Sequence, residues 1–237
     1  PHQKTSGSWG SKGYTLWKKW IILYGMTYDS INWIWYIMKK PIDNKIICIG
    51  AGGSTKVILD IIRERNNNKI IGILDDDESL YGNDFNGIKI IGKITDIVNL
   101  HSYEFDEAII CVGAVKDTYV RKKIYEYLKL NNIKVNSAIS KYAIISHNVK
   151  ISNGLIAMPG VIINSGCKIG ENVFLNTGCI IEHDCIIEKN VFIGNNCSIG
   201  SNVIIRNTVI NNNIKILDGC VIGKKGFGFF PNKKVNY

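Results

Sequence analysis

The sequence predicts two kinds of structure: a small α/β domain with a parallel sheet, followed by an all-β solenoid with three faces to each turn. Two observations predict this. From Val149 to Val209, an apolar residue or a cysteine recurs at every sixth position. Between residues 45 and 136, short apolar runs alternate with a glycine-rich turn and helical patterns. We expect the α/β domain at 45–136, the solenoid at 137–237 and a Trp-rich extension of unknown role at 1–44.

Within the α/β domain, the apolar run Ile46–Ile49 is typical of a strand buried in a parallel sheet. A glycine-rich turn follows it, and then a helical pattern from Thr55 to about Arg65. Alternation of strand, turn and helix continues, which is the doubly wound α/β order. The remaining elements are expected as strands at 69–74, 88–91, 108–112 and 133–135 and an amphipathic helix at 116–130.

In the solenoid, a period of six fits neither the 3.6 residues of an α-helical turn nor simple strand alternation. It fits short strands that each place two apolar side chains inward, because a second apolar residue follows two positions after each repeat residue. The residue before each repeat residue is mostly Gly, Asn or Asp, which tolerate positive φ at a bend. Stacked turns of this kind bury a continuous apolar prism. The repeat residues are Val149, Leu155, Val161, Cys167, Val173, Cys179, Cys185, Val191, Cys197, Val203 and Val209.

The cysteines and the charge limit the classes of function. Four of the seven cysteines occupy repeat positions, so we interpret them as small buried hydrophobic residues rather than a disulfide framework. The sequence has no C-x-x-C pair, which argues against a zinc site, and together these features favour a reducing, cytoplasmic compartment. The net charge of +9 comes from scattered lysines, so nucleic acid is not an expected partner.

Both ends of the chain depart from these patterns. Residues 14–40 hold Trp and Tyr among Ile, Leu and Lys, but their apolar runs are too short to cross a membrane. This segment could lie at a membrane surface, although packing on the following domain is the favoured interpretation. The period of six is lost after Val209, and 226–231 is expected to form a loop.

The glycine-rich turn is the first candidate binding site. Gly50, Gly52 and Gly53 separate a strand from a helix, where backbone N–H groups without a neighbouring Cβ can bind phosphate. The third glycine of the dinucleotide fingerprint is replaced by Thr55. Asp75 ends the next strand, where a carboxylate can bind a ribose hydroxyl. The pattern predicts a nucleotide of some kind, and a tight turn without a ligand is the alternative.

His183 is the candidate catalytic residue. It stands between Glu182 and Asp184 at a predicted bend of the central coil. A carboxylate beside an imidazole fixes its tautomer and stabilises the imidazolium, as a general base requires. The alternative is an exposed histidine at a turn. One histidine and two acids adjacent in sequence do not converge easily on an ion, so no metal is expected.

Several segments resemble the sialic-acid and bacillosamine type (NeuD/PglD-like) of sugar O/N-acetyltransferase, a hexapeptide-repeat family. The resemblance covers residues 45–210 and is most specific in the stretch Asn176–Cys185. It implies a left-handed β-helix assembled as a homotrimer. It also implies acetyl-CoA in a cleft between neighbouring β-helices and a UDP-linked amino sugar held by the α/β domain. The segments that carry it are 50–53, 74–77, 110–113 with Arg121, 158–164 and 176–185.

The resemblance also implies roles for individual residues. His183 would be the general base and Asp184 the acid that orients it. A backbone N–H near Ser201 would receive the thioester oxygen. The family commonly has histidine at the positions of Ser54 and Phe192, which puts the identity of the sugar in question. The implied binding residues are Gly50, Gly52, Gly53, Asp75, Asp76 and Asn176 for the substrate, and Gly194 and Ser201 for the cofactor.

The expected reaction is transfer of an acetyl group from acetyl-CoA to the amine of a UDP-linked 4-amino-dideoxy sugar, directly and with His183 as the base. Three alternatives stay open. The same base would serve a sugar O-acetyltransferase. Residues 222–229 are similar to the UDP-3-O-acylglucosamine N-acyltransferases, although no histidine follows them. The chain could also be a scaffold that has lost catalytic activity.

Overall fold

The computed structural model describes residues 44–64, 68–100, 105–113 and 118–223. The expectations for residues 1–43 of the extension and for the loop at 226–231 therefore lie outside the described residues. Within the described ranges, no helix has the length and apolar character needed to cross a membrane.

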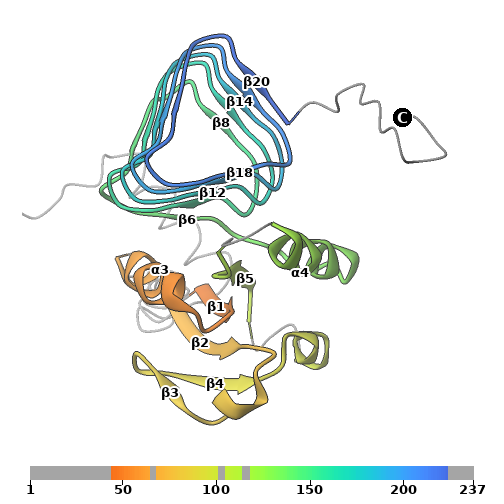
Figure 1. Cartoon of the computed structure of the whole chain (residues 1–237). Coiled ribbons are helices and arrows are strands. Elements are labelled where there is room, and N and C mark those ends of the chain that lie inside the picture. The colour runs from red at the N-terminus through yellow and green to blue at the C-terminus, as the bar shows by residue number, and fades with distance from the viewer. Residues whose placement is uncertain (1–43, 65–67, 101–104, 114–117, 224–237) are drawn as a thin grey trace, which may run out of the picture. The chain divides into compact units, whose positions relative to one another are not determined.

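The α/β domain contains a five-stranded sheet in the order β3-β4-β2-β1-β5 (Figure 1). All neighbours pair in parallel except β3 with β4, which pair antiparallel. The four predicted strands up to 112 are confirmed, and β3 is an addition. The strand expected at 133–135 is wrong, because among these residues only Val135 forms an isolated bridge, to Ala108. The strands are β1 (Asn44–Ile49), β2 (Asn68–Leu74), β3 (Asp84–Phe85), β4 (Ile88–Gly92) and β5 (Glu107–Ile110).

Helices cover both faces of this sheet, so the doubly wound arrangement is confirmed. On one face, α3 (Gly53–Arg63) packs against side chains such as Ile46 of β1. On the other face, α4 (Tyr119–Leu130) and the 3₁₀ helix η2 (Ile94–Asn99) pack against the alternate side chains of β1. A short 3₁₀ helix, η1 (Glu78–Leu80), follows β2.

The solenoid is a left-handed β-helix of two-residue strands that form three parallel five-stranded sheets, each taking every third strand (Figure 1). Sheet 1 contains β6 (Ala138–Ile139), β9 (Ile156–Ala157), β12 (Phe174–Leu175), β15 (Phe192–Ile193) and β18 (Val209–Ile210). Sheet 2 contains β7 (Ile144–Ile145), β10 (Ile162–Ile163), β13 (Ile180–Ile181), β16 (Ser198–Ile199) and β19 (Lys215–Ile216). Sheet 3 contains β8 (Lys150–Ile151), β11 (Lys168–Ile169), β14 (Ile186–Ile187), β17 (Ile204–Ile205) and β20 (Val221–Ile222). We call the bends between sheets the 1–2, 2–3 and 3–1 corners.

The inward side chains are those that the period of six predicts. Repeat residues from Leu155 to Val203 and their partners two positions later form one buried cluster, in which the four repeat cysteines pack as apolar side chains. Positive φ occurs at the residue before each of these repeat residues, but not at Asn148. Asn, Asp and Gly at the bends thus let the chain turn without strain.

The prediction for Val209 is wrong by one residue. Strands of sheet 1 pair at a spacing of 18 up to Phe174↔Phe192, but Phe192 pairs with Val209 at a spacing of 17. The bend before Val209 is one residue shorter than the other bends. Positive φ was expected at the residue directly before Val209, but Asn207, one position earlier, adopts it. Val209 is therefore an outward residue, and Ile210 takes the inward place.

Sheet 1 is the face of the β-helix that the α/β domain covers. Its outward side chains Ile156, Phe174 and Phe192 belong to the same apolar cluster as α3. At the 3–1 corner, Lys129 of α4 forms a salt bridge of 3.0 Å with Glu171. The 1–2 corner is left facing the glycine-rich turn.

Candidate active site

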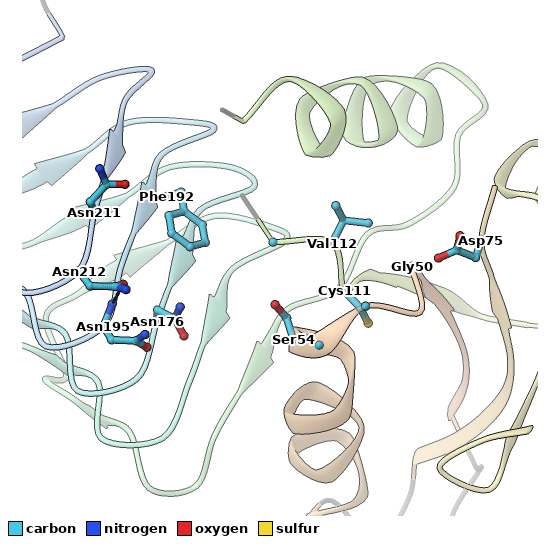
Figure 2. A pocket seen from close by; sticks show the side chains of 13 residues that line it. Gly50, Ser54, Asp75, Cys111, Val112, Asn176, Phe192, Asn195, Asn211 and Asn212 are labelled. Carbon is cyan, nitrogen blue, oxygen red and sulfur yellow. Dashed lines mark hydrogen bonds between the residues drawn. The ribbon is translucent and has the colours of Figure 1, made fainter. Parts of the chain in front are cut away.

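A pocket of about 520 Å³ lies between the glycine-rich turn and the 1–2 corner (Figure 2). The α/β domain supplies one wall, and the bends after β12, β15 and β18 supply the other. Five predicted binding residues come together here, although Asn176 is far from the others in sequence. The pocket is lined by Gly50, Gly52, Gly53, Ser54, Asp75, Cys111, Val112, Gly113, Asn176, Phe192, Asn195, Asn211 and Asn212.

The three glycines of the turn have different roles. Gly50 has φ of +99°, and a Cβ there would lie 2.5 Å from Cγ2 of Val112, so no other residue suits this position. A Cβ on Gly52 or Gly53 would meet nothing within 4 Å. Gly52 is the N-cap of α3, which has no side-chain cap and no acid in its first turn. The positive end of α3 therefore borders the pocket without a carboxylate of its own, as an anion site requires.

Thr55, which replaces the third fingerprint glycine, stabilises the turn. Its side chain is fully buried, and its Oγ1 donates a hydrogen bond of 2.8 Å to the carbonyl oxygen of Gly50. The threonine thus bridges the two ends of the turn from within the core and does not line the pocket. This explains how the loop keeps its shape without the complete fingerprint.

The two predicted aspartates differ in position. Asp75 lines the pocket, and its carboxylate accepts hydrogen bonds from the N–H groups of Ala51 (2.6 Å) and Asp77 (2.9 Å). Each carboxylate oxygen keeps acceptor capacity for a hydroxyl group. Asp76 does not line the pocket, because its Oδ1 accepts from the N–H of Ile94 (3.0 Å) at the start of η2. Its place in the structure is that of a capping residue.

Asparagine amides form much of the opposite wall. Oδ1 of Asn176 accepts from the N–H of Thr177 (3.0 Å), and Oδ1 of Asn212 accepts from the N–H of Asn195 (2.8 Å). Both carbonyl oxygens are thereby oriented, which leaves both NH₂ groups as donors toward a ligand. Sequence analysis missed Asn195, Asn211 and Asn212. Their register was the available signal, since they follow β15 and β18 as Asn176 follows β12.

Both positions at which the related family has histidine lie in this pocket. A Cβ on Gly113 would lie 3.0 Å from Oγ of Ser54 and 3.9 Å from Cε2 of Phe192, so the two side chains approach each other across Gly113. The Phe192 ring stacks on Phe174, with the ring centroids 5.1 Å apart. The departures therefore change the lining of this pocket, not a remote surface.

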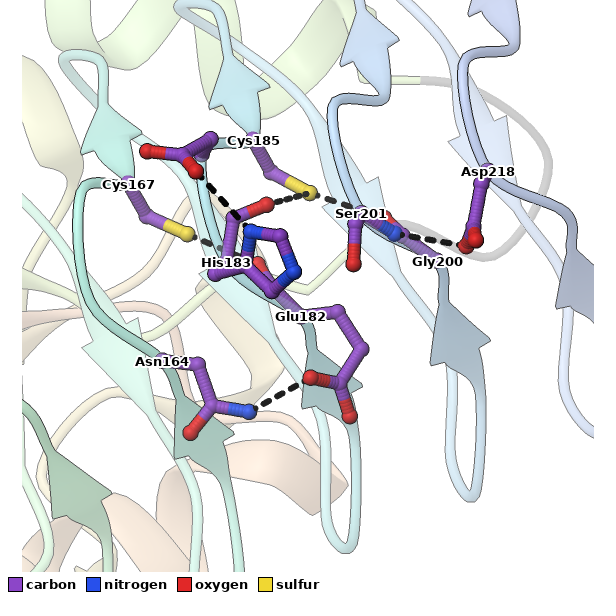
Figure 3. A network of polar contacts seen from close by, with 9 residues as sticks. Asn164, Cys167, Glu182, His183, Cys185, Gly200, Ser201 and Asp218 are labelled. Carbon is purple, nitrogen blue, oxygen red and sulfur yellow. Dashed lines mark hydrogen bonds and ion pairs between the residues drawn. The ribbon is translucent and has the colours of Figure 1, made fainter.

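His183 lies elsewhere, at the 2–3 corner opposite sheet 1, because it falls between β13 and β14. Figure 3 shows the polar contacts around it. Its Nδ1 lies 2.9 Å from Oδ2 of Asp184, and the two side chains are 55% and 58% exposed. This contact raises the pKa of His183, with smaller contributions from the charges of Glu182 and Asp218. Asp184 adopts φ of 60°, which turns its side chain back beside the imidazole. Nε2 faces away from this contact and can accept a proton.

The other groups at this corner have partners within the coil. Oε2 of Glu182 accepts from Nδ2 of Asn164 (2.8 Å), so only Asp184 bonds the imidazole. The N–H of Ser201 donates to Oδ1 of Asp218 (2.8 Å), and the donor predicted at Ser201 is therefore already engaged in this structure.

Gly194 is also explained by contacts within the β-helix. Its N–H donates to the carbonyl of Ile210 (2.8 Å), and a Cβ there would lie 2.5 Å from Oδ1 of Asn212. The close approach of the next coil thus requires a glycine at this position. Only its neighbour Asn195 borders the pocket.

In one copy of the chain, the pocket and the His183–Asp184 pair occupy different corners of the β-helix. The described residues include no group of three or more His, Cys, Asp or Glu side chains able to hold a metal ion. The arrangement offers one imidazole paired with a carboxylate and one polar pocket that ends at a helix N-terminus.

Two family models match the chain. Residues 45–128 match the PglD N-terminal domain, and residues 166–201 match the bacterial transferase hexapeptide of six repeats. A search of curated proteins found no match.

Solved structures share the fold over three quarters of the chain. One is a variant of GDP-perosamine N-acetyltransferase from Caulobacter crescentus in complex with CoA and GDP-perosamine, with a TM-score of 0.65, 20% identity and coverage of 76% of this chain and 94% of that one. The acetyltransferase domain of PglB from Neisseria gonorrhoeae gives a TM-score of 0.58, 25% identity and coverage of 76% and 91%. WeeI from Acinetobacter baumannii gives a TM-score of 0.61, 19% identity and coverage of 75% of this chain and 93% of that one. In domain content and fold, the chain therefore resembles the PglD-like sugar acetyltransferases of the hexapeptide-repeat type.

Proposed function

We propose that this protein transfers an acetyl group from acetyl-CoA to the amine of a nucleotide-linked amino sugar. The observation that carries the proposal is one pocket with three kinds of group in its lining. These are the N-terminus of α3, the carboxylate of Asp75 at a position suited to a ribose hydroxyl, and the asparagines of the β-helix. A nucleotide-linked sugar has three parts that match these groups in turn: phosphates, a ribose and a sugar with many hydroxyl groups. The perosamine enzyme of the same fold was solved with CoA and a nucleotide sugar.

Each part of the substrate has a partner in this proposal. The phosphates bind at Gly52 and Gly53, where backbone N–H groups and the helix dipole favour an anion. Asp75 accepts a ribose hydroxyl group. The NH₂ groups of Asn176 and Asn212 donate to oxygen atoms of the sugar. Our preferred nucleotide is UDP, on the resemblance in sequence, and GDP is the competing choice because the perosamine enzyme was solved with a GDP-sugar.

His183 supplies the chemistry. Its Nε2 removes a proton from the sugar amine as the nitrogen attacks the thioester carbonyl. The C–N bond forms, the C–S bond breaks, and CoA leaves as a thiol after taking up a proton. The Asp184 carboxylate holds Nδ1–H and stabilises the imidazolium. Transfer is direct, because a deprotonated amine is a competent nucleophile and the cysteines nearest to His183 are buried inside the β-helix.

A neighbouring copy completes the site. Because His183 and the pocket occupy different corners of one chain, a neighbouring copy has to bring its 2–3 corner to the pocket. Apolar side chains on the outer faces of sheets 2 and 3 support such contact: Ile144 is 65% exposed, and Ile162, Ile180, Ile186 and Ile204 are partly exposed. Two different faces that complement each other form a head-to-tail interface, which closes into a ring, and we propose a homotrimer. Acetyl-CoA would lie in the groove between copies, near Gly194 and Ser201.

Turnover with defined sugars tests this function. Release of CoA thiol from acetyl-CoA would be measured with UDP- and GDP-linked 4-amino-6-deoxy sugars and with the matching 4-hydroxy sugars. We expect thiol release and an N-acetylated product, identified by mass spectrometry, with at least one amino sugar. An ester product with the hydroxy sugars alone would establish O-transfer instead. Absence of thiol release with every sugar would leave the scaffold alternative.

A further inference from the structure

Arg121 is a buried cation outside the pocket that the mechanism above does not use. It belongs to α4 and is 2% exposed. Its Nη1 donates to the carbonyl oxygens of Ile110 (2.7 Å) and Val112 (2.9 Å), and its Nη2 donates to that of Gly154 (3.1 Å). One guanidinium group therefore joins the end of β5 to the 3–1 corner of the β-helix.

Such a group is costly to bury. No carboxylate lies within ion-pair distance of Arg121 in the described ranges, and Nε has no hydrogen-bond partner there. Burial lowers the pKa of Arg121 to about 10, so the group keeps its charge at neutral pH. An apolar side chain of similar volume would stabilise an interface as well or better. The specific property of arginine is its rigid fork of donors, which fixes the positions of several acceptors at once.

Of the acceptors that Arg121 fixes on the α/β side, Val112 belongs to the pocket wall and Ile110 lies two residues before it. Ile110 and Val112 flank Cys111, and the segment 111–113 lines the pocket. Val112 also determines the space beside Gly50, because its Cγ2 stands 2.5 Å from the place of a Cβ there. A shift of the Val112 backbone would therefore move both the wall and the glycine-rich turn.

The same guanidinium group also contacts Phe174, which stacks on the wall residue Phe192 of the β-helix. Its central carbon lies 5.4 Å from the centroid of the Phe174 ring, within the range of a cation–π interaction. Phe174 in turn stacks on Phe192, which lines the pocket. Arg121 thus reaches one wall through carbonyl oxygens and the opposite wall through two stacked rings.

From this geometry we infer that Arg121 is a positioning residue, which sets the spacing between the two walls of the nucleotide-sugar pocket. The inference rests on the proposed function for the identity of the ligand. Without the fork of donors, the 110–113 segment and Phe192 relax independently, and the affinity for the nucleotide falls. Acetyl-CoA, which we place in the groove between copies, is bound as before.

The test uses Arg121→Met, Arg121→Lys and a control, Lys129→Met. Lys129 lies on the same helix and also contacts the β-helix, through Glu171, but touches neither wall. Binding of UDP, GDP and acetyl-CoA would be measured by calorimetry on the full chain, after its thermal transition is recorded. We expect Arg121→Met to weaken nucleotide binding about tenfold, Arg121→Lys to weaken it about threefold, and Lys129→Met to leave it unchanged.

A second readout needs no ligand. Amide hydrogen exchange at Ile110–Gly113 and at Phe192 should accelerate in Arg121→Met and remain unchanged in Lys129→Met. Equal loss of nucleotide and acetyl-CoA binding, or unaltered exchange at both walls, would overturn the inference. If Arg121→Met does not fold, Arg121→Lys decides by the same two measurements. If wild type binds neither UDP nor GDP, the proposed function fails, and exchange at the two walls still decides the role of Arg121.

Discussion

Two corners of the β-helix differ, although the same six-residue repeat builds both. The 1–2 corner faces the α/β domain, and its asparagines become one wall of a pocket. The 2–3 corner is open, and its His183 and Asp184 side chains are more than half exposed. In the proposed function, the substrate is therefore bound where the repeat meets the α/β domain, and the base lies where the repeat can meet another copy. One chain holds both halves of the proposed site but does not bring them together.

The largest expected effect is on catalysis at the open corner. His183→Ala removes the proposed base, so we expect kcat to fall by about 10² to 10⁴. The matched control is His147→Ala, because His147 is exposed at the same corner and register two coils earlier. The control should keep wild-type turnover, and both variants should unfold at the wild-type temperature. Equal rates in wild type and His183→Ala would remove His183 from the mechanism.

On the α/β side of the pocket, Gly50 and Gly52 should respond differently to a single added methyl group. Gly50→Ala places a Cβ at positive φ and against Val112, so we expect a loss of about 1–3 kcal/mol in unfolding free energy. Gly52→Ala adds a Cβ that meets nothing within 4 Å and should keep stability within about 0.5 kcal/mol. Denaturant unfolding of both variants measures the difference. Equal losses would contradict the separate roles of the two glycines.

Asp184→Asn should change the pH dependence of the open corner. Asparagine also tolerates the φ of 60° found here, so the bend is retained. Because the contact with Asp184 raises the pKa of His183, its loss lowers that pKa toward the usual value near 6.5. His183 acts as a base only when neutral, so the acid limb of kcat/KM moves to lower pH. An NMR titration of the imidazole should move in the same direction, and an unmoved limb would argue against His183 as the titrating base.

The smallest effect compares one contact at two corners. Asn212 accepts the N–H of Asn195 at the 1–2 corner, and Asp218 accepts the N–H of Ser201 in the same way at the 2–3 corner. Asn212→Ala also removes a donor from the pocket wall, so KM for the nucleotide sugar should rise about three- to tenfold. Asp218→Ala should leave that KM unchanged. A rise in both variants would mean that the coil as a whole, not the pocket wall, had been disturbed.

The comparison also explains which features could be predicted from sequence. The inward residues, the bends and the glycine-rich turn follow from local rules of φ and period, so Leu155 to Val203 were assigned correctly. The shorter last coil was misplaced by one residue, because a composition of Ile, Val and Asn fits two registers near Val209. In the observed register, the side chains of Asn212 and Asp218 accept hydrogen bonds from N–H groups of the preceding coil. No local sequence pattern indicates these contacts. Likewise, the sequence gives no reason to distinguish Asp75 from Asp76. Their roles differ because Asp76 accepts a hydrogen bond at the start of η2, whereas Asp75 accepts one from the glycine-rich turn.

The central claim is that His183 of one copy acts on a sugar held by the pocket of another, and mixed oligomers test it most directly. Gly53→Asp places a carboxylate at the proposed phosphate site without a clash, and His183→Ala removes the base. Each variant alone should be inactive. Co-expressed in equal amounts, they should recover about a quarter of the wild-type sites, each pairing an intact base with an intact pocket. If the mixture stays as inactive as its components, base and pocket do not meet between copies, and the account is contradicted.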